Sequence, residues 1–279
     1  MAQTFKKGGV ALITGGASGI GLAIAKKCLG HGMRVIIVDK NPATLADASK
    51  ISTDITVLEA DVGRKEDWDS LKSVVERDFG GRIDFLALNA GMGMKSPWDD
   101  PSAFSTTFNT NIMGVVNGVS TFLPLVKRNA SAGTPSSIVI TGSKQGITNP
   151  PGNPAYNASK AAVKSLAEHL SWDLRNEQNL SVHLLVPGWT FTGMTGPSTG
   201  TGEKPAGAWL PEQVADFLEK KMGEGQFWVL CPDNEVTEAL DRKRVAWGAG
   251  DLLQGRPPLS RWRENWKERA QEGINNMEV

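Results

Sequence analysis

The sequence predicts an α/β protein built on a doubly wound parallel sheet of seven strands, with helices on both faces and a C-terminal extension. Three observations support this fold class. Short apolar runs alternate with helix-forming segments, which is the order of a parallel sheet with crossover helices. A glycine-rich turn joins the first apolar run to the first helical segment, and an acidic residue ends the second run. We expect residues 1–232 to form the main domain and residues 233–279 an extension packed on it or on a neighbouring subunit.

The strands are predicted from their almost unbroken apolar character, which is typical of strands covered on both faces. They span residues 10–14, 34–38, 55–60, 83–88, 137–141, 182–186 and 227–230. Helix-forming segments between them span residues 19–29, 43–49, 65–79, 102–127, 155–176 and 211–222. Right-handed crossovers in such a fold place the ligand at the carboxyl ends of the strands, near the point where the strand order reverses.

The turn after the first strand has the spacing GxxxGxG, formed by Gly15, Gly19 and Gly21. This is a variant of the GxGxxG fingerprint of Rossmann-like dinucleotide-binding folds. Glycine lets the backbone turn tightly and approach a pyrophosphate, whose charge then faces backbone amides at a helix N-terminus. A purely structural turn is the alternative, but the preceding strand and the following helix are the context that nucleotide binding requires.

Asp39 ends the second predicted strand. A carboxylate at this position accepts hydrogen bonds from the adenosine ribose hydroxyls and repels a 2′-phosphate, so it favours NAD(H). Lys40 follows directly and would weaken this preference, which leaves NADP(H) as the alternative cofactor.

Tyr156 is the only tyrosine of the chain, and Lys160 lies four residues later. Residues at i and i+4 are neighbours on a helix, so we expect the ammonium of Lys160 to lower the pKa of the phenol from its usual value of about 10. Such a phenol suits general acid/base catalysis. Ser143, at the end of the preceding apolar run, offers a hydroxyl to hold a carbonyl or alcohol oxygen. A solvated surface pair is the alternative interpretation of the tyrosine and lysine.

These segments together resemble the short-chain dehydrogenase/reductase family. TGGASGIG at 14–21, DV at 61–62, NAG at 89–91, NTNIMG at 109–114, ITGS at 140–143, YNASK at 156–160 and PGWTFT at 187–192 occur in the order of that family. The resemblance implies a catalytic tetrad of Asn111, Ser143, Tyr156 and Lys160. The cofactor-binding residues that it implies or that the motifs indicate are Gly15, Ala17, Ser18, Gly19, Ile20, Gly21, Asp39, Lys40, Asp61, Val62, Asn89, Ala90, Gly91, Tyr156, Lys160, Pro187, Gly188, Thr190 and Thr192. Leu88 replaces an asparagine that the family often has, a change expected to affect strand support rather than chemistry.

The activity implied by the resemblance is hydride transfer between a nicotinamide and a ketone or secondary alcohol, as in a short-chain alcohol dehydrogenase or carbonyl reductase. Tyr156 would protonate the developing alkoxide while Ser143 donates a hydrogen bond to the same oxygen. Lys160 would hold ribose hydroxyls, and Asn111 would position a water molecule. The alternative is a protein of the same fold that catalyses a cyclisation or isomerisation, or that senses a nucleotide. The presence of both Tyr156 and Lys160 favours the redox enzyme.

The composition and the apolar pattern argue against nucleic acid and membranes as partners and favour a small-molecule substrate. The 30 basic and 30 acidic side chains cancel, and phosphate binding by a nucleic-acid protein needs a concentrated positive patch. The apolar run near the N-terminus is too short for a signal peptide or membrane span, so we expect a cytoplasmic protein with no membrane partner. Cys28 and Cys231 fit no disulfide or metal-ligand spacing and are expected to be buried thiols. The three histidines, at positions 31, 169 and 183, show no metal-ligand spacing, and no metal is expected.

Residues beyond 192 follow no family motif and should determine the substrate. The segment 190–210 is rich in Gly, Thr, Ser and Pro, which predicts a loop over the active site. Three tryptophans in loops after strands, Trp98, Trp189 and Trp209, are candidates for the pocket. Those of the extension, Trp247, Trp262 and Trp266, are expected to dock it on the main body or on a second subunit. Direct contact with the substrate is the alternative.

The long helical segments 102–127 and 155–176 are expected to join subunits in a homodimer or homotetramer. The second segment carries more apolar and small side chains, including Leu166 and Ala167, than one sheet face needs to cover. A surplus apolar face on an outer helix must be buried by a partner. The resemblance implies the same pair of helices as the interface.

Overall fold

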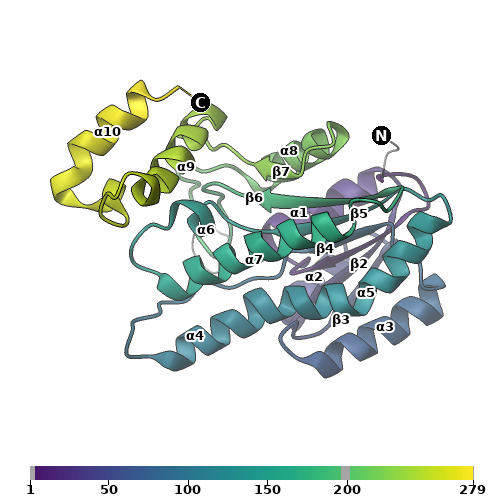
Figure 1. The fold of residues 1–279 in the computed structure, drawn as a ribbon. Coiled ribbons are helices and arrows are strands. Elements are labelled where there is room, and N and C mark those ends of the chain that lie inside the picture. The colour runs from purple at the N-terminus through teal and green to yellow at the C-terminus, as the bar shows by residue number, and fades with distance from the viewer. Residues whose placement is uncertain (1–3, 196–201, 279) are drawn as a thin grey trace.

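The fold is a single seven-stranded sheet with all strands parallel, in the order β3-β2-β1-β4-β5-β6-β7 (Figure 1). It is seen in a computed structural model that describes residues 4–195 and 202–278. The strands are β1 Val10–Thr14, β2 Arg34–Asp39, β3 Ile55–Glu59, β4 Phe85–Leu88, β5 Ser136–Thr141, β6 Leu180–Val186 and β7 Trp228–Leu230. The predicted doubly wound parallel sheet is confirmed. Strands β2 and β3 extend the sheet to one side of β1 and the last four to the other, so the switch point of the strand order lies between β1 and β4.

Helices cover both faces of the sheet, with α5 and α7 in front of it in Figure 1 and α1 and α2 behind. The helices are α1 Gly19–Gly30, α2 Pro42–Ser49, α3 Lys65–Phe79, α4 Pro101–Phe108, α5 Gly114–Ser131, α6 Gln145–Thr148, α7 Pro154–Asp173 and α8 Pro211–Gly223. Successive strand residues point to opposite faces. Leu12 therefore packs with Trp68 and Phe122 on one side of the sheet, and Ile13 with Ile24 and Leu218 on the other.

The segment predicted as one helix over residues 102–127 is divided into three parts. A π-helical turn, η1 Asn109–Met113, lies between α4 and α5. A π turn inserts one extra residue into a helix and often marks a functional site. Asn111, the predicted tetrad asparagine, is in this turn and is 1 % exposed. The short helix α6, just after Ser143, was not predicted.

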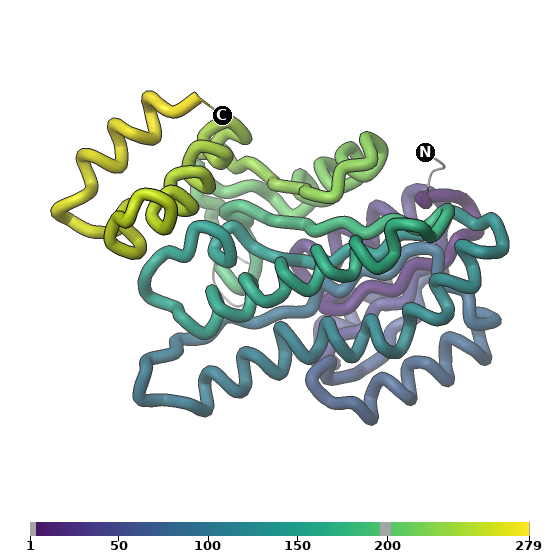
Figure 2. The backbone as a smooth tube through the Cα atoms, in the orientation of Figure 1, coloured from purple at the N-terminus to yellow at the C-terminus, as the bar shows by residue number. Residues whose placement is uncertain are grey.

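The C-terminal extension forms two helices, α9 Glu238–Leu253 and α10 Lys267–Asn276, connected by the short turns η2 Ser260–Trp262 and η3 Glu264–Trp266. Figure 2 shows α9 near α6, with α10 lying on the outer side of α9. The extension has a small core of its own, made by Trp247, Ala270 and Ile274. Trp262 contacts the main body, since its Nε1 donates to the Thr148 carbonyl oxygen at 3.3 Å. Thus Trp247 joins α9 to α10, whereas Trp262 joins the extension to α6.

Both cysteines, Cys28 and Cys231, are buried free thiols, as predicted. Within residues 4–195 and 202–278, no helix is both long enough and apolar enough to cross a bilayer. In the same part of the chain, no group of His, Cys, Asp and Glu side chains has the arrangement of a metal site.

Candidate active site

A cavity of about 1010 Å³ opens at the carboxyl ends of the central strands. Its size is that of a site for a large cofactor or ligand. Ser143, Tyr156 and Lys160 line it, together with every predicted cofactor-binding residue except Gly21. Gly21 and Asn111 lie behind the wall. The structure thus brings together segments that are far apart in the sequence.

The glycine-rich turn has a backbone path that requires glycine. Gly15 has a φ of 62°, in the left-handed region, and a Cβ added there would lie 2.9 Å from the Ala90 Cα. A Cβ on Gly21 would collide with the Gly15 carbonyl oxygen. Ser18, the N-cap residue of α1, makes no side-chain cap, so the first amides of this helix face the cavity without a side-chain acceptor. This cradle fits the pyrophosphate of a dinucleotide.

Asp39 is fixed at the edge of the cavity by two backbone amides. Its carboxylate accepts hydrogen bonds from the Ala17 amide at 3.3 Å and the Asn41 amide at 3.2 Å. Lys40 also lines the cavity but is exposed to solvent. The acidic group is therefore held in place by hydrogen bonds, while its basic neighbour is exposed.

Asn89 is held by Thr14, which was not predicted to be a residue of the site. The Thr14 hydroxyl oxygen accepts hydrogen bonds from the Asn89 and Ala90 amides, both at 3.0 Å. Thr141 donates to the Asn89 side-chain oxygen at 3.1 Å. These bonds tie together the ends of β1, β4 and β5. Leu88, just before Asn89, is buried in the main core.

Tyr156 lies in the first turn of α7, where Asn153 caps the helix and Pro154 begins it. Burial raises the pKa of its phenol above the usual value, while a hydrogen bond with Ser143 acts in the opposite direction. The prediction that a neighbouring ammonium lowers this pKa is therefore wrong. The reason is geometric: the Lys160 ammonium points to the Thr141 carbonyl oxygen, 2.8 Å away, and lies 5.8 Å from the centre of the Tyr156 ring.

Lys160 is only 4 % exposed, and burial lowers the pKa of its ammonium to about 8. Desolvation disfavours the charged form of a lysine when no counter-ion compensates for it. At neutral pH, Lys160 is thus still charged, but it gives up its proton more easily than an exposed lysine does.

Asn111 lies behind the cavity wall and connects two segments of it by hydrogen bonds. Its side-chain oxygen accepts a hydrogen bond from the Met92 amide at 2.8 Å, and its Nδ2 donates to the Met92 carbonyl oxygen at 3.0 Å and to the Ser159 hydroxyl at 2.9 Å. Ser159 in turn donates to the Tyr156 carbonyl oxygen at 2.7 Å. The π turn therefore connects the loop segment after Gly91 to the start of α7. Ser159 was missed because a small hydroxyl within YNASK carries no sign of its own.

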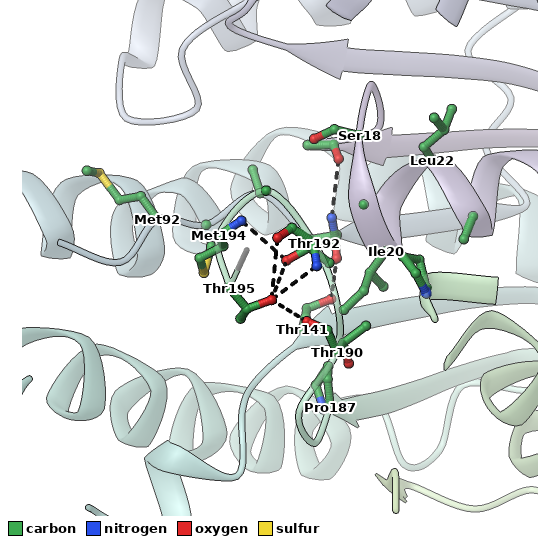
Figure 3. Close-up of a pocket in the computed structure, with 18 of the residues that line it drawn as sticks. Ser18, Ile20, Leu22, Met92, Thr141, Pro187, Thr190, Thr192, Met194 and Thr195 are labelled. Atoms are coloured by element: carbon green, nitrogen blue, oxygen red, sulfur yellow. Dashed lines mark hydrogen bonds between the residues drawn. The ribbon is translucent and has the colours of Figure 1, made fainter. Parts of the chain in front are cut away.

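Figure 3 labels Met92, Thr192 and Met194 among the residues that line the cavity, and neither methionine was predicted there. A Cβ on Gly93 would lie 3.5 Å from the Tyr156 ring and 3.8 Å from the Met194 sulfur, so both side chains lie beside Gly93. Methionine is an adaptable apolar residue, which fits the substrate end of a pocket. Its position in a loop, without periodicity, gave no sequence signal.

Of the three tryptophans predicted for the pocket, only Trp189 lines it. Trp98 is 82 % exposed and packs on Phe104 outside the cavity. Trp209 packs against Phe217 on α8. Both predictions were wrong because a loop after a strand can turn its side chains to either side. The predicted substrate loop 190–210 is described up to Thr195, which donates to the Thr190 carbonyl oxygen (Figure 3), and again from residue 202; its middle lies outside the described residues.

Comparison with known proteins gives a consistent result. The family model described as short chain dehydrogenase matches residues 9–201. An oxidoreductase of Sarocladium schorii, asL5, is 34% identical over 183 residues, which are 64% of this chain and 71% of that protein. The rhamnolipids biosynthesis 3-oxoacyl-[acyl-carrier-protein] reductase of Pseudomonas aeruginosa is 30% identical over 223 residues, covering 75% and 86% of the two chains.

Among solved structures, a short-chain dehydrogenase/reductase from Burkholderia phymatum in complex with NAD is similar, with a TM-score of 0.79 and 27% sequence identity. The match covers 91% of this chain and 97% of that one.

Proposed function

Because the chain belongs to the short-chain dehydrogenase/reductase family of oxidoreductases, we propose that it transfers a hydride between a nicotinamide cofactor and a ketone or secondary alcohol, as a carbonyl reductase or alcohol dehydrogenase. The observation that carries the proposal is that Ser143, Tyr156 and Lys160 line the same cavity as the glycine-rich turn. Loss of Tyr156 or Lys160 would favour a cyclase, an isomerase or a nucleotide sensor, and both are present.

The glycine-rich turn and the N-terminus of α1 would hold the pyrophosphate of the cofactor, and Asp39 the adenosine ribose. Asp61 and Val62 would border the adenine, and Asn89 to Gly91 together with residues 187–192 the nicotinamide half. When bound, the cofactor supplies or accepts the hydride. The fixed carboxylate of Asp39 supports NAD(H) over NADP(H).

The phenol of Tyr156 is suited to donate a proton to the oxygen of a carbonyl that is being reduced. Its raised pKa keeps it protonated at neutral pH. Ser143 hydrogen bonds to the phenol and can donate to the same substrate oxygen. The buried ammonium of Lys160 would stabilise the phenolate that remains, since opposite charges interact strongly in a desolvated site. Asn111 keeps the helix start in register by its bonds to Met92 and Ser159.

The test is a screen of ketones and secondary alcohols with NAD(H) and NADP(H), followed by the absorbance of the reduced nicotinamide. We expect turnover with at least one substrate, and a loss of about 10²- to 10⁴-fold in kcat for Tyr156→Phe with nearly unchanged cofactor affinity. Activity of Tyr156→Phe within a few-fold of the original protein would contradict the acid/base role. Conversion of a substrate without any change in nicotinamide absorbance would favour a cyclase or isomerase.

The subunit arrangement that we propose is a homodimer formed through α4, α5 and α7. Met113 and Val116 are apolar side chains that are 43% and 37% exposed on the helical segment η1 to α5, and Leu166 on α7 is partly exposed. Ala167, which the sequence suggested for the same interface, is fully buried in the chain's own core. A charge there would therefore disturb folding rather than assembly.

A charge at a two-fold interface is introduced twice. We expect Val116→Glu to dissociate the dimer, measured by light scattering after size exclusion. Ile51→Glu is the matched control, since Ile51 is 43% exposed but lies after α2. A mass of 29.9 kDa for the original protein, that of one chain, would contradict the dimer.

A further inference from the structure

Lys144 directly follows the predicted catalytic serine, and its ammonium lies between two carboxylates that come from beyond residue 232. Its Nζ is 3.4 Å from Asp233 Oδ2 and 2.5 Å from Asp241 Oδ2. The three side chains are 14%, 6% and 3% exposed. Ion pairs with so little exposure are screened weakly by water and salt, so they constrain geometry more than surface pairs do.

Asp233 also binds the loop that follows β6, which lines the cavity. Its Oδ2 accepts a hydrogen bond from the Trp189 amide at 3.2 Å, and the Lys144 amide donates to the Pro187 carbonyl oxygen at 3.3 Å. Gly188 lies against this group, because an added Cβ would be 2.8 Å from both Asp233 Oδ2 and Lys144 Nζ. One carboxylate thus joins the loop after β5 to the loop after β6.

On the side of the extension, backbone amides hold Asp233, and Asp241 is placed by its position on α9. Asp233 Oδ1 accepts hydrogen bonds from the Glu235 amide at 3.0 Å and the Val236 amide at 2.8 Å. Asp241 lies in the first turn of α9, where the positive end of the helix dipole favours a carboxylate, and the Thr237 hydroxyl caps this helix. Burial raises the pKa of Asp241, and the bond to Lys144 opposes that rise. The pairing with Lys144 therefore helps Asp241 to stay ionised.

We propose that the C-terminal extension is part of the active site: Asp233 and Asp241 are positioning residues that, through Lys144, hold Ser143 and the 187–189 loop in the geometry needed for hydride transfer. The proposal rests on the proposed function. Lys144 lines the cavity, yet its charge is neutralised by two carboxylates, so it acts as a structural anchor and not as a free counter-ion for an anionic substrate.

The first experiment compares the kinetics of Asp241→Asn with those of the original protein. The variant keeps the size of the side chain and the Lys144–Asp233 pair. We expect kcat to fall roughly tenfold to a hundredfold, because a small displacement of reacting groups is costly, while KM and the dissociation constant of NADH stay within about twofold. Lys144→Arg, which preserves the charge, should retain most of the activity. Lys127→Met is the matched control, since it breaks the 2.6 Å ion pair with Glu177, away from the cavity.

The second experiment does not depend on turnover. Hydrogen exchange measured by mass spectrometry should show faster exchange of amides 142–148 and 188–192 in Asp241→Asn, and no change there in Lys127→Met. Asp233→Asn should affect amides 188–192 more strongly, and it replaces the first variant if Asp241→Asn does not fold. Unchanged exchange in both segments, or an unchanged kcat in an active enzyme, would overturn the proposal. Absence of turnover in the original protein would instead refute the proposed function and leave the exchange result decisive for positioning.

Discussion

Lys160 and Lys144 both line the cavity, but two differently built regions of the molecule hold them. Lys160 belongs to the motif-bearing region, residues 9–192; it donates to a carbonyl oxygen, and burial alone accounts for its lowered pKa. Lys144 is in the same region of the sequence, yet its ammonium is bound by carboxylates of the extension, residues 233–278. A buried charge without a counter-ion can respond to a reaction, whereas a neutralised one fixes its surroundings. The comparison suggests that the first region supplies the chemistry and the second supplies positioning.

The two regions also differ in how their cores are built, and the largest expected effect follows from this. Trp68, fully buried on α3, donates to the Val62 carbonyl oxygen at 2.8 Å and packs edge-on against Phe122. Trp68→Ala should lower the free energy of unfolding of the whole domain by about 3–5 kcal/mol. Trp247→Ala removes the centre of the small cluster between α9 and α10, so it should release the extension and leave the main thermal transition almost in place.

Thermal unfolding together with hydrogen exchange of residues 260–277 would measure both variants. If the extension is needed for positioning, Trp247→Ala should also lose turnover while it still binds NADH. A single transition lowered equally by the two substitutions would show instead that the extension belongs to the main cooperative unit.

The contrast between the motif-bearing region and the extension also explains which features could be predicted from the sequence. All seven strands were predicted, because strands buried on both faces have unbroken apolar runs, and the glycine turn, Asp39 and the Ser143, Tyr156 and Lys160 set were assigned to the cavity that they line. These features depend on local backbone requirements. The bonds of Lys144 to Asp233 and Asp241 could not be predicted, because an ion pair between distant residues leaves no periodic pattern. Helix α9 was missed as well, since EALDRKRVAWGAGDLL mixes charged and apolar residues without a clear stripe.

The raised pKa of Tyr156 shows a further limit. Helical spacing placed Lys160 on the same side of α7, but it could not show that the ammonium would bind the Thr141 carbonyl oxygen. The direction of the shift is set by burial, which depends on the whole cavity wall. The exposed position of Trp98 has the same kind of cause, since the turn of a loop is determined by its contacts.

A second test measures how the buried charge of Lys160 affects the free energy of unfolding at different pH values. Its folded-state pKa is about 8, below the unfolded value of about 10.4, so between these values the unfolded chain holds a proton that the folded chain has lost. Stability contributed by this group therefore rises with pH across that window, by at most about 3 kcal/mol, and the cost of burying the charge is fully present below pH 8. Lys160→Met should be more stable at pH 7 than the original protein, although inactive.

Urea unfolding of both proteins from pH 7 to 10 would measure this difference. The two proteins must be compared because the buried thiols also make stability depend on pH. Burial raises the pKa of Cys28 and Cys231, so both proteins lose stability above the usual cysteine pKa of about 8.5, and the subtraction removes this shared effect. A constant gap between the two proteins over the whole range would show that the charge of Lys160 is compensated in the folded state.

The smallest expected effect concerns Asp39, which belongs to the motif-bearing region but is held by backbone amides much as Asp233 is. The carboxylate should make NADH bind more tightly than NADPH by about tenfold, or about 1.4 kcal/mol, because it repels a 2′-phosphate. Asp39→Asn keeps an acceptor oxygen for the Ala17 or Asn41 amide and removes the charge, so it should reduce this preference without unfolding the loop. Asp47→Ser, on the exposed side of α2, is the control for a lost surface carboxylate. Titration of nucleotide fluorescence measures both affinities. Tighter binding of NADPH by the original protein would mean that Lys40 outweighs the carboxylate, so that an exposed ammonium determines the cofactor preference more than a carboxylate held by backbone amides.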